Sequence, residues 1–291
     1  MTQTSNAARK VPTRRISFEE SLKALPKHFA EDGDLILSHV AASLSSVFPD
    51  GEDYFVRSVR HFRDQITDPE LKRQVAGFIG QEAMHGREHR ALNDRLDELG
   101  YPVKTAEKLT KKGLALRTKY APAKANLATT AALEHFTATL AELVLSDETT
   151  RNQFGHPAMR DIFLWHALEE SEHKAVAFDV YKAVGGTERM RVVTMNLMTV
   201  GFILGMAVQV IISLAMDRET YRRGKLRKSL RNLRKAPFLQ KKVWRQLRDY
   251  NRPNFHPDDS DTNELVELWR KELFGENGSL NDKLVGTSAV A

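Results

Sequence analysis

The sequence predicts an all-α protein made of a helical bundle, a further long apolar helix and a basic helical tail. Three long segments are bounded by proline and glycine, and each is about 25 to 30 residues long, roughly twice the mean helix length in globular proteins. Strand-like alternation of apolar and polar residues is scarce, and no Asn-Gly or Asp-Gly turn lies between β-branched segments. A β-sheet is therefore not expected.

The chain is expected to divide into a lead-in over residues 1–30, the bundle over 31–216 and a basic helical tail with a flexible C-terminus over 217–291. Residues 1–15 are polar and basic and lack the apolar segment of a secretory signal, so we expect them to be disordered and the protein to be cytoplasmic. The chain contains no Cys, which fits a reducing cytosol and excludes thiolate ligands and a cysteine nucleophile. Any metal must be held by histidine and carboxylate.

Start and stop residues delimit the bundle helices. We expect helices over 68–102, 122–146 and 157–186, because proline stands at or beside the start of each and glycine follows the first and the third. A further helix is expected to begin near Glu52, in the segment PDGEDYF. The motifs described next lie within these four segments.

Two Glu-x-x-His motifs lie on different helices. Glu82 and His85 are three residues apart in QEAMHGREH, and Glu170 and His173 repeat that spacing in EESEH. Residues three apart project from the same face of a helix. Dinuclear carboxylate proteins use one such pair from each of two helices and a single Glu from each of two others.

The single acids of this scheme are Glu52 and Glu134, each of which precedes one of the two motifs. Glu134 lies in the apolar segment TTAALEHFTATL, where an unpaired acid is costly. Four carboxylates would neutralise two divalent cations, and oxygen donors combined with imidazole suit iron or manganese. The sequence therefore predicts two metal ions, iron first and manganese as the alternative.

His166 adds a seventh candidate ligand, since it lies four residues before Glu170 and seven before His173 on the same helical stripe. An ordinary core histidine bonded to a carbonyl is the alternative. The choice of the glutamate that pairs with His173 is open as well, because Glu169 could do so at a spacing of four residues. We prefer Glu170, which aligns three candidates on one stripe.

Neighbouring polar residues receive supporting roles. His89, one turn beyond His85, is expected to act behind the ligands, although a Glu82 and His89 pair is the alternative. His135 points away from the side of Glu134 and is not expected to bind metal. Solvated helix faces or ion pairs are expected for three further acids, namely Glu88, Glu169 and Glu172.

Four segments carry a resemblance to known families: FPDGEDYF, GQEAMHGREH, ALEHFTA and WHALEESEHK. The motif set resembles the ferritin-like di-iron carboxylate proteins, and the spacing His-x-x-x-Glu-x-x-His is similar to the three-histidine site of the di-iron arylamine N-oxygenases. The order of all four segments is similar to a bacterial family described as predicted metal-dependent hydrolases. The resemblance covers roughly residues 30–215 and implies a ferritin-like four-helix bundle.

Two chemistries suit such a site. We favour O2-dependent oxidation or oxygenation of a small, amphiphilic substrate, with an electron donor that the sequence does not identify, because the helix-borne Glu-x-x-His pattern resembles di-iron oxygenases. Metal-dependent hydrolysis through a metal-bound hydroxide is the alternative. A non-catalytic iron-binding or membrane-associated helical protein is the second alternative. The apolar helix and basic tail do not suit a subunit of an iron-storage cage.

Residues 192–216 contain no charged side chain and are long enough to cross a membrane. A buried or interfacial helix is favoured over a true span, and the spacing Gly201-x-x-x-Gly205 permits close contact with the bundle or with a second copy in a homodimer. The following segment, 218–248, carries 13 Lys or Arg and a single acid, Glu219.

We expect residues 192–248 to contact an anionic membrane surface, which would place the protein peripherally at the inner face of the membrane. A lipid-like substrate would fit the same surface. Nucleic acid is the competing partner for so much positive charge, but no nucleic-acid-binding motif accompanies it. A solvated helical hairpin that packs on the acidic remainder of the chain is the plain alternative.

Overall fold

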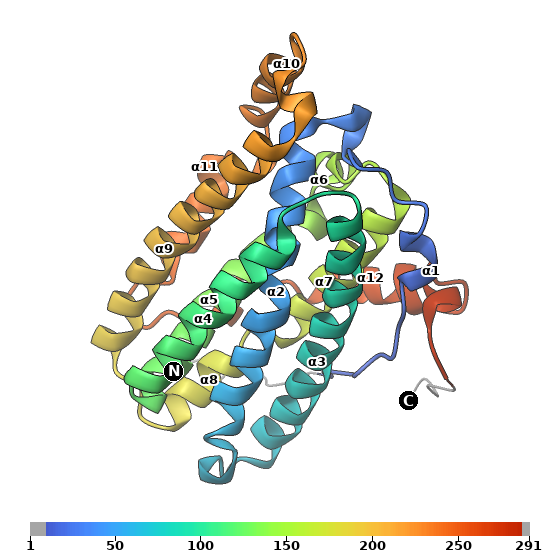
Figure 1. Cartoon of the computed structure of the whole chain (residues 1–291). Coiled ribbons are helices and arrows are strands. Elements are labelled where there is room, and N and C mark those ends of the chain that lie inside the picture. The colour runs from blue at the N-terminus through green and yellow to red at the C-terminus, as the bar shows by residue number, and fades with distance from the viewer. Residues whose placement is uncertain (1–9, 287–291) are drawn as a thin grey trace.

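The computed structural model describes residues 10–286 and confirms the all-α class (Figure 1). The described residues contain helices and no strand, apart from an isolated antiparallel bridge between Ile16 and Leu284. The α-helices are α1 (Glu19–Leu22), α2 (Leu35–Arg60), α3 (Pro69–Glu98), α4 (Val103–Tyr120), α5 (Ala123–Ser146), α6 (Glu148–Gln153), α7 (Pro157–His173), α8 (Val176–Ala183), α9 (Glu188–Met216), α10 (Lys225–Leu233), α11 (Lys241–Asp249) and α12 (Asn263–Phe274). Short 3-10 helices are η1 (Glu31–Gly33), η2 (Arg63–Gln65), η3 (Arg218–Tyr221), η4 (Pro237–Leu239), η5 (Pro257–Asp259) and η6 (Asn281–Lys283).

The predicted start and stop residues act as expected in α3. The carboxylate of Asp68 accepts the backbone N–H of Glu70, Pro69 occupies the first turn, and Gly100 follows the helix with a positive φ of 85°. The third predicted helix differs from the expectation, because it is interrupted after His173 and continues as α8. The expected helix start near Glu52 is wrong, since Glu52 lies well inside α2.

Helix α2 passes through Pro49 without ending. Proline cannot donate a backbone hydrogen bond, which leaves the carbonyl four residues earlier, that of Ser45, without its usual partner. Nδ2 of Asn93 on α3 donates to that carbonyl at 3.2 Å. A side chain of the neighbouring helix thus compensates for the proline, and Glu52 is buried one turn further along α2.

Four central helices surround the buried polar residues. α2 packs on α3, α5 packs on α7, and these pairs meet through contacts of α2 with α5 and of α3 with α7. The apolar core consists of two main clusters, one around Trp165 and the other around Phe78. The ring of Trp165 contacts His85 and the ring of Phe78 contacts His173, each at 4.9 Å between centroids. The polar residues therefore lie between two apolar clusters.

Both ends of the described chain pack against the bundle. Residues 10–30, expected as part of the lead-in, contribute Ile16, Phe18 and Phe29 to the core, and the tail contributes Leu280. Helix α12 packs on α7, and Leu273 at its end is buried. Burial of these apolar side chains attaches both segments to the bundle, and residues 1–9 and 287–291 lie outside the described residues.

Helix α9 packs along α2 and α5 on one side and is open on the other. Within residues 10–286 it is the one helix that is long and apolar enough to cross a membrane, and 6% of its most apolar stretch is buried. Figure 1 shows α9 along one edge of the molecule, with α10 beyond its C-terminal end.

Candidate metal centre

The structure brings all seven predicted ligands together between the four central helices. α2 and α5 each supply one glutamate, whereas α3 and α7 supply the Glu-x-x-His pairs and the additional histidine. One donor atom from each of three residues lies within 4.8 Å of the others in two separate groups. These groups are Glu82, Glu170 and His173, and Glu52, His85 and His166.

Glu170 lies between the two groups. Its Oε1 atom is 3.0 Å from Nε2 of His166, 3.6 Å from Nδ1 of His85 and 3.6 Å from Nε2 of His173. Glu134 adjoins the first group, with Oε2 3.4 Å from the same nitrogen of His173. A carboxylate placed between two sets of donors suits the bridge between two metal ions.

Several of these donor atoms are buried and have no hydrogen-bond partner within the described structure. They comprise both carboxylate oxygens of Glu52, Glu82 and Glu134, together with Oε2 of Glu170, Nδ1 of His85 and Nε2 of His173. Each buried polar atom without a partner costs on the order of 1 to 3 kcal/mol, and more if charged. Cations bound here would satisfy these atoms, so the donor set fits a metal centre.

Hydrogen bonds outside the centre determine which nitrogen of each histidine faces inward. Nε2 of His85 lies 3.1 Å from Oε2 of Glu169, which can only accept when ionised. Nδ1 of His173 donates to Oε1 of Gln81 at 2.8 Å, because the amide nitrogen of Gln81 already donates to Glu172. In the neutral form of each ring, which is the form that binds metal, the inward nitrogens, Nδ1 of His85 and Nε2 of His173, therefore carry the free lone pairs.

A longer chain of hydrogen bonds leads to His166. Nδ2 of Asn93 donates to the carboxylate of Glu107, so its Oδ1 must accept from the hydroxyl of Ser45. Ser45 Oγ then accepts from Nδ1 of His89, and the free Nε2 of His89 accepts from Nδ1 of His166 at 2.7 Å. Nε2 of His166 is left as an acceptor, although it lies 3.0 Å from the carboxylate of Glu170. A proton or a metal ion is required between two such acceptors.

Arg14 supports the outer side of the centre. It donates to Glu169 at 2.9 Å and to Glu172 at 2.7 and 2.8 Å, and Arg270 donates to Glu172 as well. Sequence reasoning missed Arg14, since it lies in the expected lead-in, far along the chain from its partners. It also missed Gln81, whose position four residues before His85 on the ligand-bearing helix was the available signal.

The electrostatics match a site built for cations. Burial, together with repulsion between the carboxylates, raises the pKa values of Glu52 and Glu82 well above the ordinary carboxyl value. Burial and the charge of Glu170 raise the pKa of Glu134 to about 7. Burial would raise the pKa of Glu170 too, but the positive charge of His173 and the hydrogen bonds of His166 and His173 outweigh it and hold that pKa well below its usual range. Burial likewise lowers the pKa of His173, but Glu170, Glu134 and Glu82 outweigh it and raise that pKa well above its ordinary value. Bound cations would relieve this repulsion.

The supporting residues fall partly as expected. His89 lies behind His166, and His135 bonds the carbonyl of Gln246 away from the centre. Glu169 bonds His85 rather than pairing with His173. The solvated helix faces considered for three acids are wrong, while the ion-pair alternative holds for all of them because each is buried and bonds an arginine: Glu88, Glu169 and Glu172.

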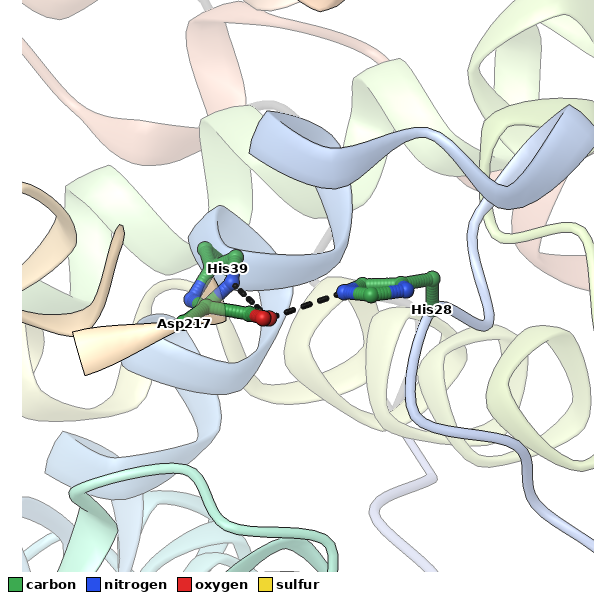
Figure 2. Close-up of side chains that lie close together, drawn as sticks. All are labelled: His28, His39 and Asp217. Atoms are coloured by element: carbon green, nitrogen blue, oxygen red, sulfur yellow. Dashed lines mark hydrogen bonds and ion pairs between the residues drawn. The ribbon is translucent and has the colours of Figure 1, made fainter. Parts of the chain in front are cut away.

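A second cluster lies at the C-terminal end of α9, where His28 and His39 both point at the carboxylate of Asp217 (Figure 2). Their Nε2 atoms lie 2.8 and 3.1 Å from Oδ2, and Lys27 lies 3.3 Å from the same oxygen. Oδ1 accepts the backbone N–H of Glu219. With an ammonium group already in place and no donor atom left unsatisfied, this cluster anchors the end of α9 and does not require a metal ion.

A hollow of about 400 Å³ lies near this second cluster, lined by residues of the N-terminal segment and α10. None of the seven candidate ligands lines it. The buried donor atoms without partners lie at the carboxylates between the central helices, away from this hollow.

Fold and site together define an all-α protein with a buried carboxylate and histidine cluster suited to metal. A family model described as predicted metal-dependent hydrolase matches residues 12–261, and the chain belongs to this family. Comparisons with curated proteins and with solved structures gave no match. The resemblance to ferritin-like proteins and to the N-oxygenases therefore stays a prediction.

Proposed function

We propose that the protein is a metal-dependent enzyme whose buried centre binds two divalent metal ions through the seven predicted ligands. The observation that supports this most directly is the set of buried donor atoms without partners, in a position where three imidazole rings lie within reach of the same carboxylates. Four carboxylates balance the charge of two divalent ions. Iron is the preferred metal, with manganese and zinc as alternatives to be tested.

Hydrolysis is the reaction that the family supports. Divalent ions at this centre would lower the pKa of water and polarise a carbonyl or phosphoryl oxygen. The chain's own residues would hold the ligands in place: Glu169 and Gln81 orient two imidazoles, and Phe48 packs against the ring of His166 at 4.6 Å. This apolar cover limits access of bulk water to the centre.

Oxidation of a small, amphiphilic substrate with O2 is the second candidate. One specific observation favours it: Glu52 and Glu134 come from two helices and the Glu-x-x-His pairs from two others, as in dinuclear carboxylate oxidases. Redox-active iron would supply electrons to O2 at such a centre, with a separate donor to reduce it again. The ligand residues would be the same in both candidates.

Metal loading followed by two assays tests these proposals. Metal-free protein would be loaded with Zn²⁺, Mn²⁺ or, without air, Fe²⁺, and we expect two ions per chain. Cleavage of a panel of carboxylic and phosphate esters by the Zn²⁺ or Mn²⁺ form would support hydrolysis. Rapid O2 consumption by the Fe²⁺ form, followed by stopped-flow absorbance, would support oxidation if no ester is cleaved.

Matched variants make the result specific to the centre. Glu134→Gln should lose the activity, whereas Glu142→Gln, on the same helix but bonded to Gln246 outside the centre, should retain it. Protein that binds only trace metal would contradict both candidates. Two bound ions without either activity would favour a non-catalytic metal-binding role.

A further inference from the structure

The outward face of α9 forms an apolar surface that the rest of the described chain does not cover. Leu197 and Leu204 are each 61% exposed and lie seven residues apart, on the same side of the helix. Monomeric soluble proteins rarely expose continuous apolar patches beyond a few hundred Å². The large exposed apolar residues of this face, here called the α9 surface, are Val193, Leu197, Val200, Ile203, Leu204, Val208, Ile211, Ile212 and Met216.

The opposite side of α9 is attached to the bundle. Met195 and Ser213 are buried, and the ring of Phe202 packs on Phe136 at 5.4 Å. Asp217, which follows the last residue of α9, bonds His39 of α2 (Figure 2). A membrane-crossing orientation would carry α2 and α5 into the bilayer with α9, so the attachment favours a helix that lies in the plane of a membrane surface.

Strong positive charge follows the α9 surface along the chain, and α10 lies beyond the C-terminal end of α9 (Figure 1). Basic residues begin immediately after Asp217 and continue through α10 and α11. Segment 218–248 contains a single acid, Glu219, which pairs with Lys225. The remaining basic side chains of this segment are all exposed: Arg218, Arg222, Arg223, Arg227, Lys228, Arg231, Arg234, Lys235, Lys241, Lys242, Arg245 and Arg248. An apolar face that is followed by a strongly basic segment is complementary to an anionic lipid surface.

We propose that the α9 surface inserts into the interface of an anionic bilayer, with α9 lying in the membrane plane and the basic residues of 218–248 contacting lipid headgroups. Each basic residue close to such a surface contributes attraction that salt weakens. The surface is separate from the metal centre and does not depend on the reaction there. Its inner side nevertheless packs on α2 and α5, the helices that carry Glu52 and Glu134.

A site-specific fluorescent label tests the insertion. The chain has no Cys, so Val200→Cys provides a single attachment point for an environment-sensitive dye on the α9 surface. On addition of vesicles that contain phosphatidylglycerol, we expect a blue shift and higher intensity. The matched control is Leu268→Cys on α12, where Leu268 is 52% exposed and lies outside the α9 surface. The emission wavelength and intensity of a label at position 268 should not change when vesicles are added.

Charge variants and vesicles of different lipid composition test whether the basic residues of 218–248 contact lipid headgroups. Co-sedimentation should rise with the anionic fraction of the vesicles, fall with salt and weaken at least tenfold when Arg227, Lys228 and Arg231 are changed to Gln. Changing Arg63, Lys72 and Arg73, at the α2–α3 connection, should have little effect. Circular dichroism of each variant verifies the fold.

Two results would overturn the proposal. If the label at position 200 is already blue-shifted without vesicles and light scattering gives a dimer, a second copy covers the α9 surface. If the full-length protein is a monomer and ignores anionic vesicles at low salt, the surface is not a membrane-binding site.

Discussion

Nε2 of His85 lies 3.1 Å from Oε2 of Glu169, whereas Nδ1 of the same ring lies 3.6 Å from Oε1 of the next residue, Glu170. Two consecutive glutamates of α7 thus face the two nitrogens of one imidazole. Glu169 holds the ring and is itself held by Arg14, while Glu170 lies between the two groups of candidate ligands. Substitution of the residues that hold this ring therefore tests the centre, as substitution of the candidate ligands does.

Arg14→Leu should lower the free energy of unfolding by about 3 to 5 kcal/mol, because it leaves the buried carboxylates of Glu169 and Glu172 with less compensation. Urea unfolding of the metal-free protein measures this. Adding Glu169→Gln should restore part of the loss. The pair of the exposed Arg73 with the partly exposed Glu70 provides the control, since Arg73→Leu should cost less than about 1 kcal/mol. Equal costs for Arg14 and Arg73 would contradict the role of Arg14.

Gln81→Leu should weaken metal binding by about 10- to 100-fold, because Nδ1 of His173 loses the acceptor that fixes its ring. Competition with a metal-binding indicator dye gives the affinities. Gln74→Leu is the matched control, since Gln74 is buried on the same helix and donates to Glu70, which is not a candidate ligand. An unchanged affinity in Gln81→Leu would show that this hydrogen bond does not orient the ligand.

Glu134→Gln should reduce the metal content from two ions per chain to at most one while the metal-free protein becomes more stable. The reason for the second effect is that the amide cannot ionise, which removes repulsion toward Glu170. Elemental analysis and thermal unfolding measure the two quantities. Normal occupancy by two ions would exclude Glu134 as a ligand.

The gain in stability from Glu134→Gln should depend on pH. The folded pKa of Glu134 is about 7, above the ordinary value of 4.5, so the folded state retains a proton that the unfolded chain has released. Wild-type stability therefore loses this contribution as pH rises from about 4.5 to 7, by about 3 kcal/mol in total. The variant's advantage over the metal-free wild type should grow over that interval and level off above it. A constant difference would contradict the raised pKa.

Most helices and the set of candidate ligands could be predicted from local patterns. Asp68 and Pro69 specify the start of α3 through a side-chain cap and a fixed φ, and Gly100 terminates it through a positive φ. The spacing of three residues between Glu82 and His85 puts both on one face of any α-helix. Such features depend on residues close in sequence, which is why they could be predicted.

The extent of α2 could not be predicted in the same way. Pro49 normally indicates a helix boundary, and it does not end α2 because Asn93, from another helix, bonds the carbonyl that the proline leaves free. The break after His173 is likewise not marked by proline or glycine. The continuation of α2 thus depends on a side chain from another helix, which a local pattern does not indicate.

By itself, the sequence determined the all-α class, the four segments that carry the candidate ligands and the concentration of basic residues in 218–248, because helical periodicity and charge are properties of neighbouring residues. Only the tertiary structure decided that Glu170 faces the centre while Glu169 bonds His85, that Arg14 reaches these helices, and that α9 leaves an apolar side uncovered. These outcomes depend on contacts between segments far apart in the chain. Burial then determines their energetic weight, since a carboxylate removed from water must have a partner.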